Sequence, residues 1–454
     1  MQVTETHSDG LKRQLKVVVD AGEIGARFNA RLDEIKDRVQ LKGFRKGRVP
    51  KQHLKKVFGR SLMGEVLQQT IEEKCRAALS ERNERPAFQP QISLPEDQQE
   101  IEKVMSGQAD LAFDMSFEVL PEVNLVDFAE LKLERPVAEV DDKAIEEALN
   151  QLAERSTSYE SAEGRAAEKG DRLTVDFVGK IDGEPFEGGS AEGVNIVLGQ
   201  GGFIPGFEEG LEGAKAGEER TVKATFPENY PEKSLAGKEA AFDVKVKDVA
   251  APKRPAIDDE FAKTLGAEDL GKLRELVSEQ LKREYEQASR AKVKRALLDE
   301  LDKRHDFALP PSLVDREFEG IWRQVTESLQ QAGRTFEDEG KTEEQAREEY
   351  RKIAERRVRL GLILGEVGEK AEIQVTQDEM RRALVEQARR FPGQERFVYE
   401  FYEKNPGALS ELRAPIYEEK VVDHILGKVK LEDKTVSREE LFKQDEEEAE
   451  TAEG

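Results

Sequence analysis

Apolar residues follow two different periods within the first 115 residues of the chain. The stretches 11–19 and 111–119 alternate apolar with polar positions, which predicts two half-buried strands. Between them, residues 20–39 carry apolar side chains every three or four positions, as an amphipathic helix does, namely Ile24, Phe28, Leu32, Ile35 and Val39. A second helical pattern follows Pro50, a residue suited to the start of a helix. We therefore expect a small α+β domain over residues 1–114.

Residues 115–155 predict a connector to the next domain. A strand fits residues 131–140 and a helix fits residues 141–155. The stretch 156–170 is polar throughout, which is typical of a linker.

Glycine-rich segments of alternating polarity dominate residues 168–250, where the helical period disappears. The dipeptide Asp182-Gly183 predicts a tight hairpin turn, and the string GFEEGLEG fits one short helix. The expectation is a compact domain of antiparallel strands with one helix over residues 156–250. The proline-rich segment 251–257 then predicts a second linker.

The helical period returns after this linker and persists through residues 251–442. Proline and glycine residues punctuate it. The expected helices are 267–303, 311–332, 341–370, 376–390 and 407–430. Residues 443–454 are acidic and of low complexity, which predicts a disordered tail. Taken together, the patterns indicate a multidomain α+β protein.

Composition narrows the class of protein. The single cysteine, Cys75, excludes an intrachain disulfide and fits a reducing compartment. The first residues lack the apolar core of a signal peptide, and the longest apolar runs are far shorter than a membrane span. We expect a soluble, cytoplasmic protein that does not contact membranes.

Charge is distributed very unevenly along the chain. The formal net charge is −24, yet nine Lys and Arg residues and no acidic residue occur between Arg38 and Arg60. Without these nine, the rest of the chain sums to −33. An acidic surface of this size repels bulk nucleic acid, so the basic block is the one place suited to an anionic partner. A solvated basic loop is the ordinary alternative.

Motifs for metal binding, nucleotide binding and covalent catalysis are missing from the sequence. We therefore expect no metal and no cofactor. The glycine-rich domain does contain seven aromatic residues within 66 positions, namely Phe177, Phe186, Phe203, Phe207, Phe226, Tyr230 and Phe242. Their spacing alone favours an ordinary sheet core.

The same stretch resembles an FKBP-type peptidyl-prolyl isomerase domain. The resemblance rests on ordered strings that include GDRLTVDFVGKIDGEPFEGG, LGQGGFIPGFEEGLEG and AAFDVKVKDV. In that family an aromatic-lined pocket binds proline. Carried over by position, the resemblance implies as pocket residues Phe177, Phe186, Glu187, Phe203, Ile204, Phe207, Tyr230 and Phe242. Many members have Trp where this chain has Phe207, a difference that bears on drug-like ligands rather than on isomerase activity.

The order of the three parts resembles the trigger factor family of ribosome-associated bacterial chaperones. The string GFRKGRVP, between two predicted helices, is similar to the loop that docks this family on the large ribosomal subunit beside the exit tunnel. The resemblance implies contacts with ribosomal RNA and protein by Gly43, Phe44, Arg45, Lys46, Gly47, Arg48, Val49 and Pro50.

The resemblance has three further implications. It implies that residues 115–155 pack on the helical region. It implies that this region is an elongated all-α chaperone domain whose arms hold nascent and unfolded polypeptides. It also implies a homodimer when the protein is free of the ribosome.

Three functions stay open on the sequence alone. The first is a chaperone that is partly bound to ribosomes, prevents aggregation of nascent chains and isomerises Xaa-Pro bonds. The alternative is a free cytoplasmic FKBP-type prolyl isomerase without ribosome docking, which leaves the basic block without a role. The third is an RNA-binding factor. It is disfavoured because such proteins stack bases on aromatic side chains, and Phe44 and Phe58 are the only aromatic residues among the basic ones.

Overall fold

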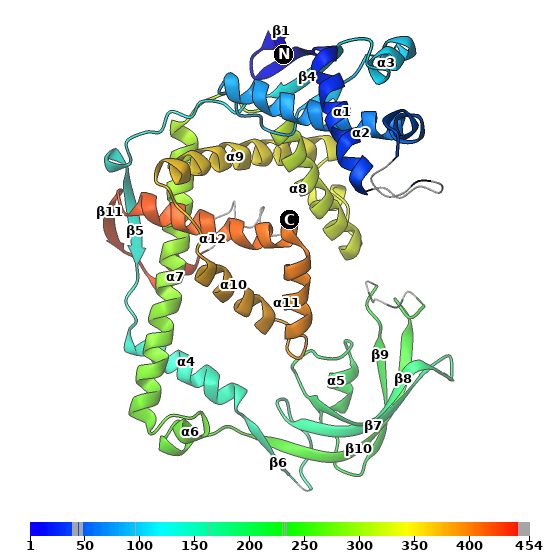
Figure 1. The fold of residues 1–454 in the computed structure, drawn as a ribbon. Helices are drawn as coiled ribbons and strands as arrows, with labels where there is room; N and C mark the ends of the chain where they lie inside the picture. The colour runs from blue at the N-terminus through cyan, green and yellow to red at the C-terminus, as the bar shows by residue number, and fades with distance from the viewer. Residues whose placement is uncertain are drawn as a thin grey trace. The chain divides into compact units, whose positions relative to one another are not determined.

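The computed structural model describes residues 1–38, 44, 49–95, 97–162, 164–228, 230, 232 and 234–443 of the 454-residue chain. The chain divides into two compact units (Figure 1). Unit 1 comprises Met1–Pro136, Ser289–Thr435 and Phe442–Gly454, and unit 2 comprises Val137–Ala288 and Val436–Leu441. Within the described residues, no helix is both long and apolar enough to cross a membrane.

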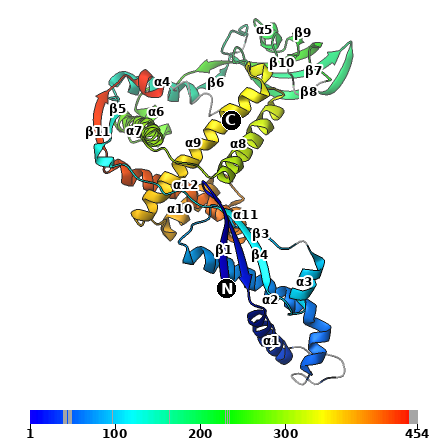
Figure 2. The same cartoon turned by 90° about the horizontal axis from the view of Figure 1, so that it is seen from above.

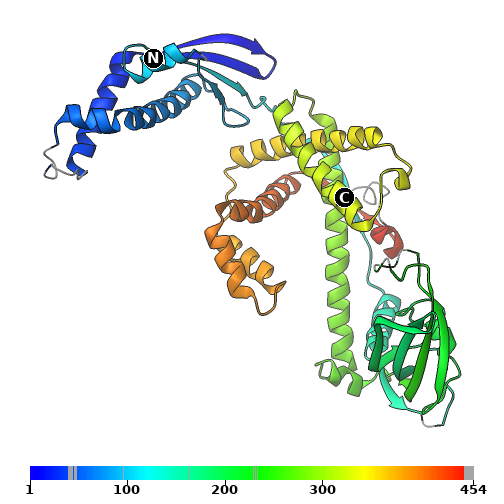
Figure 3. The same cartoon turned by 90° about the vertical axis from the view of Figure 1, so that its right-hand side faces the viewer.

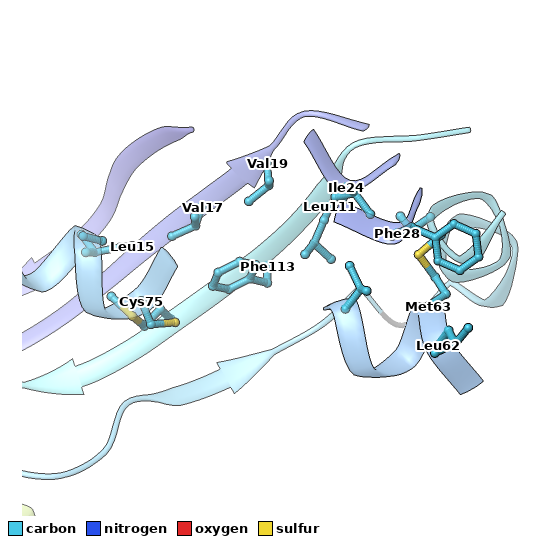
Figure 4. Close-up of a cluster of buried hydrophobic side chains, with 14 of the residues drawn as sticks. Leu15, Val17, Val19, Ile24, Phe28, Leu62, Met63, Cys75, Leu111 and Phe113 are labelled. Carbon is cyan, nitrogen blue, oxygen red and sulfur yellow. The ribbon is translucent and has the colours of Figure 1, made fainter. Parts of the chain in front are cut away.

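The N-terminal part of unit 1 is a four-stranded antiparallel sheet packed against two helices. The strand order is β1 (Gln2–Asp9), β2 (Lys12–Val19), β4 (Leu111–Glu118) and β3 (Gln91–Ser93). The helices are α1 (Ala21–Arg38), α2 (Lys51–Glu81) and the short α3 (Gln98–Met105). Figure 4 shows Leu15, Val17 and Phe113 pointing from β2 and β4 into the core that α1 and α2 complete. The predicted strands and first helix are confirmed.

Strand β1 was not predicted, and its sequence explains why. QVTETHSD is almost entirely polar, and seven of its eight residues are exposed. The strand forms because its backbone pairs with β2 at the edge of the sheet, an interaction that leaves no apolar period in the sequence.

The connector after β4 packs against helices that lie far along the chain. Phe128 of η1 (Phe128–Glu130), Leu131, and Leu133 of β5 (Lys132–Val137) share one buried cluster with residues of α7 (Leu270–Arg304), α9 (Glu343–Lys370) and α12 (Pro406–Leu426). β5 pairs with β11 (Lys430–Thr435), and Arg135 donates to both carboxylate oxygens of Asp433 at 2.6 and 2.8 Å.

β11 differs from the sequence expectation, since the region was expected to be all-α. The helix expected over 407–430 ends at Leu426, and the polar strand KLEDKT follows it. As with β1, the backbone pairs with a neighbouring strand, and the side chains show no apolar alternation.

Most of the remaining unit 1 is helical. α7 (Leu270–Arg304) belongs to unit 1 from Ser289 onward, and α8 (Pro311–Ala332) and α9 (Glu343–Lys370) lie side by side in Figure 2. Pro311 starts α8, and Gly333, with φ of 67°, ends it, so the predicted helix 311–332 is confirmed. Thr342 and Gln345 form a capping box at the start of α9.

Three further helices pack on one another at the C-terminal side of unit 1 (Figure 3). They are α10 (Gln377–Arg389), α11 (Glu395–Lys404) and α12 (Pro406–Leu426). The sequence predicted α10 and α12 but not α11, a ten-residue helix in the short segment between Pro392 and Pro406.

Unit 2 contains a helical base and a β domain. α4 (Asp142–Arg155), α6 (Asp259–Thr264), the first part of α7 and α13 (Arg438–Phe442) surround a buried cluster that includes Tyr285. β6 (Ser158–Ser161) pairs with the end of β10 (Glu239–Lys253). The linkers expected at 156–170 and 251–257 were therefore wrong in part, since each contributes strand residues.

The β domain is antiparallel throughout, as predicted. β6, β10, β7 (Arg172–Ile181) and β8 (Glu184–Val197) are neighbours in that order, and β9 (Glu219–Thr225) pairs with β10. Asp182 and Gly183 have φ of 53° and 90°, and they close the β7–β8 hairpin that the Asp-Gly dipeptide predicted. The short helix α5 (Phe207–Leu211) packs on β9, and a Cβ on Gly210 would overlap the side chain of Val222.

Candidate functional site

Seven aromatic side chains of the β domain form one contiguous group, here termed the aromatic cluster: Phe177, Phe186, Phe203, Phe207, Phe226, Tyr230 and Phe242. Phe207 begins α5, and Phe242 lies on the central strand β10. Their ring centroids are 5.0 Å apart with planes at 87°, and both side chains are buried. Edge-to-face pairs of this kind are favourable, so Phe207 and Phe242 make a firm base.

Half-buried rings surround this base. Phe177 of β7 meets Phe207 at 5.6 Å, and Phe203, in the loop before α5, stacks on Phe207 at 5.3 Å and 20°. Phe186 of β8 meets Phe242 at 6.2 Å. Ile204 is also half-buried and packs against the same core. The rings therefore combine a dry interior with a solvent-accessible rim.

Two glycines make room for Phe186. A Cβ on Gly179 would lie 2.7 Å from ring carbons of both Phe186 and Phe242, and a Cβ on Gly189 would lie 2.7 Å from the Phe186 ring. Phe186 thus lies across backbone that carries no side chain. A glycine inside a strand often marks such a close approach.

The structure brings together six of the eight isomerase residues predicted from the sequence. Ile204 borders them, whereas the side chain of Glu187 lies outside the described residues. Tyr230 contacts the cluster through Phe226, at a centroid distance of 4.7 Å.

Phe226 was missing from the predicted site. Its ring joins Phe186, at 5.9 Å, to Tyr230. The signal that could have found it is its place among the seven aromatics of the domain, since six of the seven were assigned to the site.

The second candidate site is the loop between α1 and α2. Gly43, Arg45, Lys46, Gly47 and Arg48 lie outside the described residues. Phe44 is half-buried against the N-terminal core, and its ring centroid is 5.1 Å from that of His53.

The other predicted docking residues differ in exposure. Val49 is only 1% exposed and belongs to the N-terminal core. Pro50 is exposed and precedes the first residue of α2 with an extended backbone.

Lysines that follow the loop are held near the helix pair. The Nζ of Lys51 lies 2.6 Å from an oxygen of Asp33, and the Nζ of Lys55 lies 5.7 Å from the centroid of Phe28. These contacts tie part of the basic block to α1.

No group of three or more His, Cys, Asp or Glu side chains suited to holding a metal ion occurs among the described residues.

Three family models match consecutive parts of the chain. Residues 1–152 match the model described as bacterial trigger factor protein, and residues 269–427 match the bacterial trigger factor C-terminus. Residues 163–247 match the FKBP-type peptidyl-prolyl cis-trans isomerase model. A trigger factor of Methylobacterium sp. (strain 4-46) is 55% identical over 450 residues, which cover 99% of this chain and 93% of the relative.

The chain belongs to the trigger factor family. The trigger factor of Azorhizobium caulinodans agrees with this assignment, with 53% identity over 449 residues, 99% of this chain and 100% of the relative. Membership gives the chain an N-terminal ribosome-binding domain and an FKBP-type isomerase domain within one chaperone. A free isomerase without ribosome docking is not favoured.

One solved structure shares the fold of this trigger factor family member. It is titled "Promiscuous Substrate Recognition in Folding and Assembly Activities of the Trigger Factor Chaperone". The two chains superpose with a TM-score of 0.53 at 22% identity, over 94% of this chain and 99% of the other.

Proposed function

We propose that the aromatic cluster is the place where this chaperone binds a prolyl residue and isomerises the bond before it. The observation that carries the proposal is the continuous contact of seven rings from β7, β8, β10, α5 and the connecting loops. The buried pair Phe207 and Phe242 supports the proline ring from below. Phe177, Phe186 and Phe203 flank it.

The chemistry requires neither an acid nor a base. Rotation about a peptide C–N bond has a barrier of ~18–20 kcal/mol because resonance gives that bond double-bond character. Resonance also places charge on the carbonyl oxygen, which water stabilises. An aromatic surface that excludes water removes this stabilisation from the planar amide and favours the twisted form. We assign to the Tyr230 hydroxyl a hydrogen bond to the substrate backbone, and to Glu187 the ordering of the polar edge.

The experiment measures cis–trans exchange of a proline peptide by NMR. Phe186→Ala is the test variant because Phe186 is only half-buried, so the sheet should tolerate its loss better than that of Phe207. Val178→Ala is the matched control, since Val178 is exposed on the opposite face of β7. We expect Phe186→Ala to lose at least tenfold in kcat/KM, about 1.4 kcal/mol of transition-state stabilisation, and Val178→Ala to keep full activity. A folded Phe186→Ala with full activity would remove the cluster from the mechanism.

We propose further that the loop Gly43–Pro50 docks the chain on the large ribosomal subunit through ribosomal RNA and protein. The support is the acid-free basic block in a chain of net charge −24, together with the match to the trigger factor model over residues 1–152. Arginine and lysine side chains suit phosphate oxygens and acidic side chains alike. The half-buried Phe44 supports the loop from the core side, together with Val49.

Sedimentation with ribosomes tests this docking. Arg45→Glu should lower the bound fraction strongly, and binding of the unchanged protein should weaken with salt. Lys143→Glu is the matched charge control, because Lys143 is 83% exposed on α4, outside the N-terminal part. Equal binding of Arg45→Glu and Lys143→Glu would contradict the proposal. If the unchanged protein bound purified ribosomal RNA as well as it bound ribosomes, and Arg45→Glu lost both, the RNA-binding alternative would be favoured instead.

We propose that unfolded clients contact the exposed face of α11. Val398 is buried and Tyr402, four residues on, is half-buried, whereas Phe397 and Phe401 are 68% and 46% exposed. Apolar rings left in solvent on an ordered helix mark a surface for apolar partners. Several weak contacts of this kind hold a chain and release it quickly.

We also propose that the protein acts in the cytoplasm, where the ribosomes are, and forms a homodimer when free. The support for self-association is the complementarity between the basic block and the acidic remainder of a second copy. Sedimentation velocity should then show a dimer that dissociates with added salt and with Arg45→Glu. A monomer at every salt concentration would contradict it.

A further inference from the structure

One buried charge in the β domain has no part in the isomerase chemistry described above. Glu208 is the second residue of α5 and only 7% exposed, and it stands beside the base ring Phe207. Buried carboxylates are rare because removing their charge from water is costly unless hydrogen bonds replace the solvent. The contacts of Glu208 therefore indicate what its burial achieves.

Those contacts run to the loop that connects β8 to α5. One oxygen, Oε2, accepts hydrogen bonds from the backbone N–H groups of Gly199, at 2.7 Å, and Gly201, at 3.2 Å. The other oxygen, Oε1, accepts from the N–H of Phe203 at 3.3 Å. One carboxylate thus gathers three N–H groups of a five-residue segment that belongs to none of the strands in the described part of the chain.

The sequence of the loop explains why it needs this support. Gly199 and Gly201 have φ of 86° and 68°, a region that glycine adopts readily, and Gly202 follows. Glycine-rich backbone has much conformational freedom, so the unsupported loop has many accessible conformations. The Glu208 carboxylate stabilises the loop conformation in which three backbone N–H groups point toward it.

The ionisation state of Glu208 agrees with this geometry. Burial alone raises the pKa of a carboxyl group, but the N–H groups of Gly201, Gly199, Phe203 and Gly202 outweigh burial and hold the pKa of Glu208 below its ordinary value of 4.5. The group is therefore an anion at neutral pH and accepts through both oxygens.

We propose that Glu208 is a positioning residue of the isomerase site, which holds Phe203 and Ile204 against the other rings of the aromatic cluster by anchoring the loop from Gly199 to Phe203. Phe203 is fixed at two points, its N–H by the carboxylate and its ring by the stack on Phe207 at 5.3 Å. Without the carboxylate only the ring contact remains, and the substrate must order the loop as it binds. The proposal rests on the assignment of the aromatic cluster as the isomerase site.

The test compares Glu208→Gln with Glu212→Gln in the full-length chain. Glu208→Gln preserves size but removes the charge and one of the two acceptor oxygens. Glu212 is an exposed glutamate directly after α5, so Glu212→Gln controls for loss of a negative charge at this end of the domain. The measurements are kcat and KM for a proline peptide by NMR exchange, and hydrogen exchange of single backbone amides.

We expect Glu208→Gln to accelerate exchange at Gly199, Gly201 and Phe203 and to leave the amides of β7 and β10 unchanged. Substrate binding energy is then used to order the loop, so KM should rise, and kcat/KM should fall by about tenfold to a hundredfold, as for misplaced positioning groups. Glu212→Gln should match the unchanged protein in both measurements.

Other results overturn the proposal. Unchanged kcat/KM in Glu208→Gln overturns it, and so does lost activity without faster loop exchange. If kcat falls at constant KM and the β7 and β10 amides also exchange faster, Glu208 serves only global stability. Should Glu208→Gln not fold, Glu208→Asp, which keeps the charge and shortens the reach, must show the faster loop exchange and the raised KM.

Phe186→Ala, measured in parallel, separates this proposal from the one it rests on. An inactive Phe186→Ala with a fully active Glu208→Gln overturns the positioning role alone. A fully active Phe186→Ala overturns the assignment of the site itself.

Discussion

Gly179 offers the sharpest test of the aromatic cluster, because one added carbon should disturb two of its rings. Gly179 lies opposite Phe242 in the register of β7 and β10. Its Cβ in Gly179→Ala would sit 2.7 Å from carbons of both Phe242 and Phe186. Carbon atoms prefer separations of about 3.5–4.0 Å, so at least one ring must move by about 1 Å.

The size of the effect follows from that displacement. Overpacking a core by one carbon costs about 1–3 kcal/mol, which the domain should survive. A displacement of about 1 Å at a site that works by positioning costs up to about 100-fold in rate. Gly179→Ala should therefore unfold at a lower temperature and lose about tenfold to a hundredfold in kcat/KM. NMR exchange of a proline peptide, at a temperature where the sheet amides are intact, measures this loss.

Two further variants make the reasoning refutable. The three atoms nearest to the Cβ of Gly189→Ala would all be ring carbons of Phe186, so this variant reports chiefly on Phe186. Gly320 in α8 has open space around its Cβ position, so Gly320→Ala should leave isomerase activity unchanged. If Gly179→Ala is folded and as active as Gly320→Ala, the placement of Phe186 and Phe242 does not govern the reaction.

Three other outcomes are expected. Cys75 is buried, and burial raises the pKa of its thiol to about 11, so it should resist DTNB at pH 8 in the folded protein and react fully in denaturant. The hydrogen bond from Lys420, with those from Thr376, lowers the pKa of Glu379 to about 2. The ionised Glu379 side chain therefore contributes fully to the stability of α10 above pH 4.5, and this contribution is lost as the pH falls toward 2. Urea unfolding of Glu379→Gln should lack this pH-dependent contribution. Replacing Phe397 and Phe401 by Ser should weaken client binding by roughly 1 kcal/mol per ring, about fivefold each, in an aggregation assay, whereas Arg396→Ser, on the same helix and 93% exposed at its side chain, should not.

Periodicity predicted those elements whose side chains carry the stabilisation. β2 and β4 alternate because one face packs on α1 and α2, and α8 was predicted to the residue because Pro311 and Gly333 mark both of its ends. β1 and β11 were missed because their backbones pair while nearly all of their side chains are polar and exposed. α11 was missed because it has only ten residues and lies between Pro392 and Pro406, and two helix breakers this close together indicate a loop.

The candidate site, too, could be predicted only in part from the sequence. Residue types suited to binding proline could be assigned from the resemblance to a family, so six rings of the cluster were named in advance. The distances within the site could not be predicted. The room that Gly179 makes for Phe186 depends on strand register, and the hydrogen bonds of three backbone amides to Glu208 depend on how the loop folds back. In the sequence Glu208 is one of two adjacent glutamates, and no sequence feature distinguishes it from Glu209 as the buried one.

The last prediction is that client holding and proline isomerisation can be separated by a deletion. The register of β6 and β10 gives the best limits for that deletion. The aromatic cluster lies wholly within the β domain, whereas the exposed rings of α11 belong to unit 1. A deletion of residues 156–250 would leave the last residues of β10 without a partner strand. Ser158 and Lys253 are a better pair of limits, because they are cross-strand partners and the Ser158 hydroxyl donates to the Lys253 carbonyl oxygen at 3.3 Å.

Excision of Ser158–Lys253 therefore needs little rearrangement of the helical base. Antiparallel partners lie about 4.5–5.5 Å apart, close to the ~3.8 Å between consecutive Cα atoms, so Thr157 can be joined to Arg254. Arg254 stays anchored because it donates to the Asn150 carbonyl oxygen of α4 at 3.0 Å. The shortened chain should lack isomerase activity but still suppress aggregation of an unfolded protein. A folded, monodisperse product that suppresses none would move the main client site into the β domain and refute the role of α11.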